Sequence, residues 1–486
     1  MTRALTVVHA LGLMLVVFSA AYVMPLVTAI VYSDQSVLLD FLTAMVWTLA
    51  IGFLMWLLTR RFKGELSIRH GYLLVVAMWV AMPAVATLPL LLTIDDLSFT
   101  DAYFETMSGL TTTGATVLTG LDNLPPAINI WRHELQWLGG MGIIVLAVAV
   151  LPLLGIGGRQ LFKAETPGPM KEATLTPRIA ETARNLWLVY VMITLACIVS
   201  LKLVGMSWLD AICHAFATLS TGGFSTHDAS IGYFNSPAIE TVMIIFMLLA
   251  AMNFATHFLA WRGKSLKPYF HDTEAMAMIV LILASCLATA IFLWWKGIYA
   301  DFWTALRHVS FNMVSLATDS GFASVDFGQW PIFAPMWMLF LSCIAVSSGS
   351  TGGGIKMIRT LVLFKQAGRE FLKLLHPTAV NPLKIGGQVV ANNIVFAVLG
   401  FIFLYFMTVA TLTFVLLISG LDFISAFTAI IACINNAGPG LGVVGPAGNY
   451  GVLTDFQTWV CTMAMLVGRL EIFTVLILFT PHFWRR

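Results

Sequence analysis

The sequence predicts an all-α polytopic membrane protein. It contains an N-terminal helix pair and four tandem repeats of helix, short half-helix, polar loop and helix. Of its 486 residues, 59% are hydrophobic and 10% are charged, and the mean hydropathy is +0.88, far above that of a soluble globular protein. Apolar stretches of membrane-spanning length follow one another along the chain, and a polar turn containing a glycine recurs four times between them.

Ten apolar stretches are long enough to cross a membrane, because a bilayer core about 30 Å thick requires ~20 residues per helix. The first is too long and too uniform for a cleaved signal peptide, so we expect a retained helix. The ten expected spans are residues 4–32, 39–58, 72–93, 134–157, 185–206, 238–261, 275–296, 332–356, 390–419 and 457–480.

Four shorter, half-apolar stretches lie between these spans. They are residues 100–113, 208–222, 301–320 and 422–437. Four of the loops between spans, together with the two termini, hold 21 of the 26 Lys and Arg residues, so both termini are predicted to be cytoplasmic. The short stretches then all enter from the outer face, as re-entrant loops around one axis would, whereas inverted repeats would enter from opposite faces.

One glycine aligns the four short stretches. The aligned turns read TTTGAT, STGGFS, TDSGFA and NNAGPG, and their glycines are Gly114, Gly223, Gly321 and Gly438. In the first two copies an Asp-Ala pair, beginning at Asp101 or Asp210, stands thirteen residues before the glycine. The chain therefore contains four copies of one unit.

A polar turn at membrane depth needs a physical reason, because non-helical backbone is tolerated there only where it lines a cavity or is buried in protein. A half-helix that descends from the outside points its carboxyl end, with roughly half a negative charge, at the membrane centre. Carbonyl oxygens of the turn, with some hydroxyls, can then replace the water shell of a cation. Packing contacts between helices are the alternative use of small polar residues, and four copies on one face favour the ion path.

The turns TTTGAT, STGGFS, TDSGFA and INNAGPG resemble those of the TrkH branch of the TrkH/KtrB superfamily of bacterial potassium transporters. The resemblance implies four helix, pore-helix, filter-loop and helix repeats with pseudo-fourfold symmetry, and K⁺ as the transported ion with no organic cofactor. It also implies a homodimer in the lipid of the bacterial inner membrane and control by a cytosolic, nucleotide-binding regulator of the TrkA type. Neither nucleic acid binding nor enzymatic activity is implied.

The resemblance also implies which residues hold the ion and how the chain divides. The coordinating residues would be Thr111, Thr112, Ser220, Thr221, Thr318, Asp319, Asn435 and Asn436, with the four glycines beside them. The domains would be a helix pair at 1–58 and pore repeats at 72–157, 185–261, 275–386 and 390–486.

A glycine-rich run interrupts the eighth expected span. Residues 345–359, AVSSGSTGGGIKMIR, place eight Ser, Thr and Gly residues where a helix should continue. A phosphate-binding P-loop is excluded, because Ile355 follows Gly354 where that motif requires lysine and no strand precedes the run. In the family the corresponding segment is an intramembrane gating loop, so residues 345–355 are expected to obstruct the ion path and to move. The gating residues would include Ser347, Gly349, Gly352, Gly353 and Gly354.

Two charged residues leave alternatives open. Arg469 is expected near the middle of the tenth span, where it either adds an electrostatic barrier to the cavity or pairs with loop carbonyls or a buried acid. Asp319 is either an ion ligand or a partner of backbone amides behind the filter. Glu105, His214 and Arg307 are interpreted as partners behind the filter rather than as ligands.

Other classes fit less well. A membrane-embedded hydrolase would need a nucleophile and a base, or a metal cluster, at recognisable spacing. The six cysteines form no CxxC pair, which argues against a zinc site or a disulfide framework. An ion-coupled K⁺/H⁺ or K⁺/Na⁺ symporter is the alternative to a passive channel, and the sequence leaves that choice, the K⁺ over Na⁺ selectivity and the regulator's nucleotide open.

Overall fold

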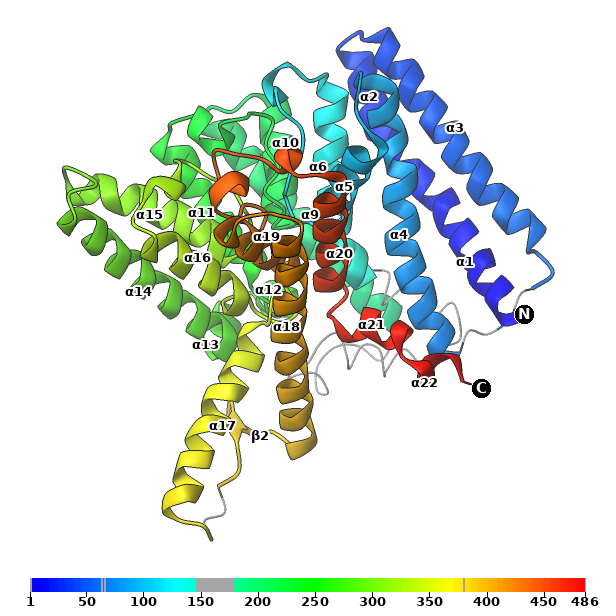
Figure 1. The fold of residues 1–486 in the computed structure, drawn as a ribbon. Helices are drawn as coiled ribbons and strands as arrows, with labels where there is room; N and C mark the ends of the chain where they lie inside the picture. The colour runs from blue at the N-terminus through cyan, green and yellow to red at the C-terminus, as the bar shows by residue number, and fades with distance from the viewer. Residues whose placement is uncertain (1, 63, 65–66, 146–178, 379–380, 486) are drawn as a thin grey trace.

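The computed structural model describes residues 2–62, 64, 67–145, 179–378 and 381–485, and most of these residues are helical (Figure 1). In this part of the chain the only strands are β1 (Lys384–Ile385) and β2 (Gln388–Val389), which pair antiparallel as a small hairpin. Residues 146–157 of the expected fourth span lie outside the described residues.

The N-terminal helices form a hairpin at one edge of the molecule (Figure 1). It contains α1 (Thr2–Phe18), the turn η1 (Ser19–Tyr22), α2 (Val23–Val31) and α3 (Gln35–Leu58). Helices α1 and α3 cross closely, because a Cβ on either Gly12 or Gly52 would lie 2.8 Å from the carbonyl oxygen of the other. Tyr22 stacks on Trp131 with ring centroids 4.6 Å apart, which fixes the hairpin to the rest of the protein.

Four consecutive segments of the chain then follow one order of long helix, short helix, loop and further helix. The first has α4 (Ile68–Thr93), α5 (Phe99–Leu110) and α6 (Pro126–Val145), and the second has α9 (Ile179–Leu203), α10 (Trp208–Leu219), α11 (Pro237–Ala251) and α12 (Phe254–Gly263). After α13 (Lys267–His271), the third has α14 (Thr273–Trp295), α15 (Phe302–Ala317), α16 (Phe333–Ile344) and α17 (Met357–Leu375). The fourth has α18 (Asn392–Ile418), α19 (Phe423–Asn435) and α20 (Asp455–Arg469), followed by α21 (Phe473–Leu476), η8 (Ile477–Phe479) and α22 (Pro481–Trp484). Short 3-10 turns lie in the connections: η2 (Leu121–Asn123), η4 (Ser230–Tyr233), η5 (Phe327–Gln329), η6 (Gly442–Val444) and η7 (Tyr450–Val452).

Three expected spans are not continuous helices. Among the described residues, six helices are long and apolar enough to cross a membrane, or eight when each of two bent pairs counts as one span. Helix α11 meets α12 at 99°, and α20 meets the helical turns Phe473–Phe479 at 108°. Helix α16 ends at Ile344, before the glycine-rich run.

The backbone at the two bends explains why the helices stop there. Asn253 leaves the helical conformation and caps α12 by accepting a bond from the amide of Ala255. After α20, Glu471 and Ile472 have φ angles of +52° and +27°.

The basic stretch 356–386, expected as a loop, is largely the helix α17, which projects away from the body of the protein (Figure 1).

The short helices lie inside the protein, and the long helices surround them (Figure 1). Every residue of α5 from Ala102 to Leu110 is buried. By contrast, the outer helix α18 exposes Phe396, Phe403 and Phe414 by 64–71% of their surface. Large apolar side chains on that scale are expected where lipid rather than water surrounds a helix.

Candidate ion-binding site

The four short helices begin in the same way. In each, a Ser or Asp side chain at the N-cap accepts a hydrogen bond of 2.9–3.1 Å from the backbone amide three residues later. The caps are Ser98, Ser207, Asp301 and Asp422. Such caps satisfy amides that a helix otherwise leaves without partners at its start.

The four short helices also end in the same way, at loop 1 (residues 111–117), loop 2 (220–226), loop 3 (318–324) and loop 4 (435–441). One residue turns left-handed with φ of +54° to +58°, and the next amide donates to the carbonyl five residues back at 2.8 Å. The glycine that follows has φ of +76° to +84°. The left-handed residues are Thr112, Thr221, Asp319 and Asn436, and the glycines are Gly114, Gly223, Gly321 and Gly438.

The four glycines touch one another's loops in a closed ring. A Cβ on Gly114 would lie 1.9 Å from the carbonyl oxygen of Gly222, and one on Gly223 would lie 2.2 Å from that of Ser320. The series continues from Gly321 to Ala437 at 2.7 Å and returns from Gly438 to Thr113 at 2.9 Å. No larger residue fits these positions, because both the approach and the positive φ require glycine.

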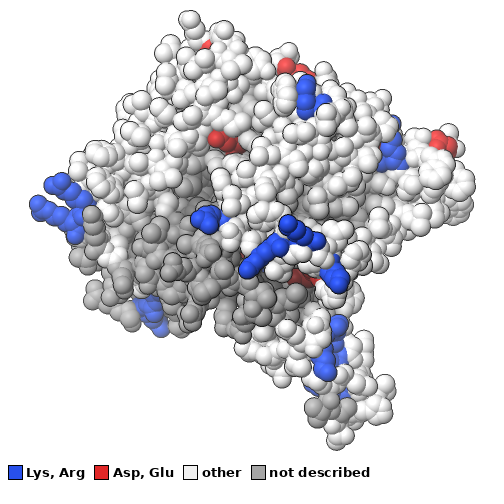
Figure 2. Space-filling view, turned by 180° about the vertical axis from the view of Figure 1, so that it is seen from behind, with Lys and Arg blue, Asp and Glu red and all other residues white. Residues whose placement is uncertain are grey.

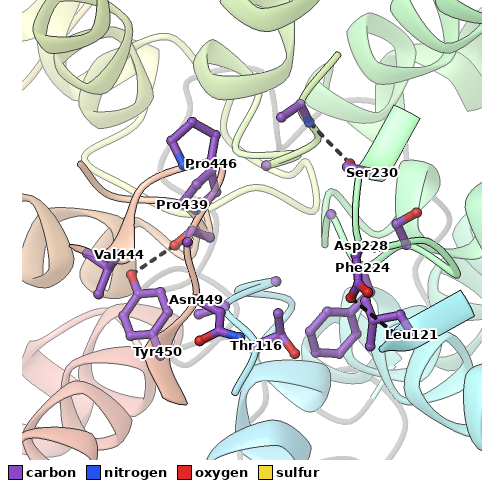
Figure 3. Close-up of a pocket in the computed structure, with 18 of the residues that line it drawn as sticks. Thr116, Leu121, Phe224, Asp228, Ser230, Pro439, Val444, Pro446, Asn449 and Tyr450 are labelled. Atoms are coloured by element: carbon purple, nitrogen blue, oxygen red, sulfur yellow. Dashed lines mark hydrogen bonds between the residues drawn. The ribbon is translucent and has the colours of Figure 1, made fainter. Parts of the chain in front are cut away.

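The same glycines line a cavity that opens toward the outer side of the ring. Figure 3 shows Thr116 of loop 1, Phe224 of loop 2 and Pro439 of loop 4 around it. The hydroxyl of Tyr450 donates to the carbonyl of Gly438 at 3.0 Å, so the wall of the cavity also supports loop 4. The ring and the cavity therefore share one axis.

Four of the eight residues predicted to supply oxygens to the ion use their side chains in the scaffold. The hydroxyls of Thr111 and Thr318 each donate to a carbonyl four residues back at 2.7 Å, and that of Ser220 donates to Ala217 at 3.2 Å. The amide oxygen of Asn435 accepts from Tyr405 at 2.7 Å. These four side chains hold their helix ends, which leaves the loop carbonyls as the main candidate ligands.

Three of the four left-handed residues differ, whereas the hydroxyl of Thr221 donates to the carbonyl of Ser220 at 2.6 Å. Within the described residues, Thr112 Oγ1, Asp319 Oδ1 and Asn436 Oδ1 are buried without a hydrogen-bond partner. Buried oxygens without partners are costly and call for an explanation. Three equivalent positions with such an oxygen form a donor set suited to a hard cation.

The segment 345–355 packs against three of the loops. The carboxylate of Asp319 accepts from the amide of Gly353 at 2.9 Å, which is the backbone-amide alternative for this residue. Thr351 donates to the carbonyl of Leu219 at 3.1 Å, beside loop 2. A Cβ on Gly353 would lie 2.0 Å from the carbonyl oxygen of Asn435 in loop 4. Non-helical backbone therefore lies directly against the ring.

Other residues hold the far side of this segment. The amide of Ser347 donates to the carbonyl of Ala251 at 3.1 Å, at the break between α11 and α12. The amide of Ser348 donates to the carboxylate of Glu274 at 2.8 Å. Gly349, with φ of +74°, accepts from the amide of Phe254 at 3.1 Å.

Arg469 is the last residue of α20 and lies at the bend that divides the expected tenth span. Its guanidinium is buried and donates to the carbonyl of Thr351 at 2.7 Å and to that of Gly139 in α6 at 2.8 Å. The bond to Thr351 corresponds to the second alternative for Arg469, in which it pairs with loop carbonyls. Arg469 thus connects the segment 345–355 to the first of the four chain segments.

The chain beyond loop 1 and the chain beyond loop 2 are joined through Asp122. His227 lies 2.5 Å from the carboxylate of Asp122, and the amide of Asp228 donates to the same carboxylate at 3.2 Å. Partial burial opposes ionisation of Asp122, but these hydrogen bonds outweigh it and lower the pKa of its carboxyl below the usual value.

Several residues at this site were not among the predicted site residues. Lys356 is buried at the start of α17 and donates to the carbonyl of Gly352. Arg132 is buried beside Glu105, with its Nε 2.8 Å from the carboxylate. Arg132 could have been found from the sequence, because it is a charged residue within a largely apolar stretch.

Comparison with known proteins gives the family. A family model described as "TrkH: Cation transport protein" matches residues 38–486. The proteins named "Trk system potassium uptake protein TrkH" of Salmonella typhimurium and Escherichia coli are 46% and 45% identical, over 99% of each chain. The crystal structure of the potassium transporter TrkH from Vibrio parahaemolyticus matches with a TM-score of 0.89 at 44% identity, over 99% of each chain. The family predicted from the four turns is confirmed, and the chain belongs to the TrkH family of cation transport proteins.

Proposed function

We propose that this chain carries K⁺ into the cell across the bacterial inner membrane, through a central pore whose selectivity filter is formed by loops 1 to 4. The closed ring of glycine contacts carries the proposal, because it places four equivalent backbone turns around one axis. Each turn follows the carboxyl end of a capped short helix, where partial negative charge favours a cation. The relatives named as potassium uptake proteins support K⁺ as the ion.

The proposed ion ligands are backbone carbonyl oxygens of the loops. Side-chain oxygens of left-handed residues form a second set of ligands. The buried oxygens without partners on Thr112, Asp319 and Asn436 support this second set. One glycine in each loop implies a short filter compared with the TVGYG loops of tetrameric channels. The four chain segments would then be the pore repeats of a pseudo-fourfold channel.

The segment 345–355 is the proposed gate. Its contacts with loops 2, 3 and 4 support a position on the ion path. Arg469 would hold it closed, because two short bonds from a buried guanidinium tie the carbonyl of Thr351 to α6. A change at the cytoplasmic side that moves α20 or α17 would release it.

The proposal includes a second copy of the chain and a cytosolic nucleotide-binding regulator of the TrkA type. Helix α17 supports a docking role, because it projects from the side on which both termini lie (Figure 1) and exposes Lys365 and Lys373. Most of the Lys and Arg visible in Figure 2 also lie toward that side, in keeping with cytoplasmic termini.

Growth of a potassium-uptake-deficient bacterium at submillimolar K⁺ tests the proposal. The unaltered chain should restore growth, and Gly114→Ala should abolish it. Gly297→Ala is the matched control, because Gly297 has a similar φ of +72° but open space around it. Failure of the unaltered chain, or growth with Gly114→Ala equal to the control, would contradict the proposal.

A further inference from the structure

In each of the four segments, a side chain of the short helix bonds to the following loop beyond its glycine. The bonds join Glu105 to Val117, His214 to Ser225, Asn312 to Ser324 and Thr428 to Leu441, at 2.8–3.1 Å. Three of these helix residues stand nine positions before the glycine, and Thr428 stands ten. Each bond ties the outer half of a loop to the helix that precedes it.

The first of these ties differs from the other three because it is ionic. The carboxylate of Glu105 accepts from the amide of Val117 and from the hydroxyl of Thr116, both at 3.0 Å. It is paired with Arg132 at 2.8 Å, and both side chains are only 1% exposed. Hydrogen bonds to charged groups stabilise more than neutral ones, about 1.5–3 kcal/mol against about 1 kcal/mol.

Arg132 extends this tie to the neighbouring loop. Its guanidinium donates to the carbonyl of Ser225 in loop 2 at 3.2 Å and lies 4.3 Å from the ring centre of Phe224. It also donates to the hydroxyl of Thr116 in loop 1 at 3.3 Å and lines the cavity outside the ring. The pair therefore fixes the distance between loops 1 and 2.

We propose that Glu105 and Arg132 are a positioning pair that sets the discrimination between K⁺ and Na⁺. The inference rests on the proposed function, because discrimination requires a filter. Carbonyls held apart by a rigid tie suit the larger ion, whereas loops free to move inward can also surround Na⁺. Loops 3 and 4 are held by neutral bonds, so we expect the ionic pair to contribute most to this rigidity.

The test measures ⁸⁶Rb⁺ uptake into proteoliposomes containing the purified full chain, with K⁺ or Na⁺ as competitor. In Glu105→Gln, inhibition by Na⁺ relative to K⁺ should rise by about tenfold, the equivalent of 1.4 kcal/mol. Thr116→Ala removes the hydroxyl that bonds both Glu105 and Arg132 but leaves the ion pair, so it should shift the ratio in the same direction by only about threefold. Glu240→Gln is the matched control, because Glu240 pairs with Arg307, whose remaining bond goes to Asn235.

A purely structural role is separated by the double variant Glu105→Gln with Arg132→Met. Removing both members avoids an unpaired buried charge, so folding should recover. If the pair positions the loops, discrimination stays low in the folded double variant. Normal discrimination there, or in Thr116→Ala if Glu105→Gln does not fold, overturns the proposal. Absence of uptake by the unaltered chain would contradict the proposed function instead.

Discussion

Loops 1 to 4 and the segment 345–355 are both polar, non-helical backbone inside a membrane protein, and they are held in different ways. Each loop is fixed to its own short helix by an amide that donates to a carbonyl only five residues back. The segment depends on partners far away in sequence: Asp319, Glu274 and Arg469 bond to residues 34, 74 and 118 positions distant. Local bonds repeat the same geometry four times, whereas the distant bonds occur once each.

Under the proposed function, this difference would separate a rigid filter from a gate that moves. A turn closed by local bonds keeps its geometry as long as its helix does. A segment held by a few side chains from other helices is released when one of those helices shifts. Both kinds of backbone pack directly against each other at Gly353 and Asn435, so changes at that contact test the comparison most strongly.

Gly353→Ala should have the largest effect. Its Cβ would lie 2.0 Å from the backbone carbonyl oxygen of Asn435, so loop 4 or the segment must shift. Overpacking of this kind costs up to about 3 kcal/mol, and we expect K⁺ uptake to fall by about 100-fold. Gly352→Ala is the control, because its Cβ would meet side-chain atoms of Val346 at 2.7 Å rather than backbone. Equal uptake by the two variants would show that the contact does not couple the segment to loop 4.

Arg469→Ala should raise K⁺ uptake in the absence of a regulator by about tenfold, because two bonds to a charged group that hold the segment are lost. Arg469→Lys separates the two roles considered for this residue. Lysine keeps the charge but cannot reproduce the planar fork that reaches both Thr351 and Gly139. Flux like that of Arg469→Ala would assign the effect to the tie, and unaltered flux would assign it to the charge. The exposed Arg262 at the end of α12 provides a control for loss of positive charge.

The short helices and their turns could be predicted from the sequence, because the cause is local. An apolar stretch too short to cross the membrane, ended by a polar turn with a glycine, recurs at Gly114, Gly223, Gly321 and Gly438. The sequence predicts that Thr111 and Thr318 supply oxygens to the ion, and in the structure their hydroxyls bond carbonyls four residues back. Ser and Thr commonly make this local bond in helices, so these bonds could have been predicted from the sequence.

The broken spans could not be predicted in the same way. The stretches around Met252 and Leu470 are mostly apolar, so their average hydropathy stays high across each break although Asn253, Arg469 and Glu471 are polar or charged. The partners that stabilise the bent backbone come from elsewhere in the chain. The amide of Phe254 bonds to the carbonyl of Gly349 at 3.1 Å, and Glu471 accepts from Arg359 at 2.6 Å. Such contacts exist only after the four segments have assembled.

Asp319→Asn sharpens the comparison at a residue that belongs to a loop and also holds the segment. An asparagine oxygen can still accept from the amide of Gly353, so we expect the KM for K⁺ to change by less than about threefold, within the range of one neutral hydrogen bond. Asp319→Ala removes the acceptor and should lower uptake further. A large rise in KM for Asp319→Asn, measured by concentration-dependent ⁸⁶Rb⁺ uptake, would instead identify the charge as an ion ligand.

Ser98→Ala should have the smallest effect, and it tests the rigid side of the comparison. Loss of an N-cap lowers the free energy of unfolding by about 1 kcal/mol, which corresponds to a Tm decrease of about 2 °C in a large domain. Ser207→Ala should give the same decrease, since the two caps have equivalent bonds of 3.1 and 3.0 Å. Ser200→Ala, at an exposed position within α9, should leave Tm unchanged. Uptake per folded molecule should be unaltered in all three variants, because each loop is held by bonds at the carboxyl end of its helix. A loss of uptake in Ser98→Ala without a fall in Tm would mean that the outer ends of the short helices act on the ion directly.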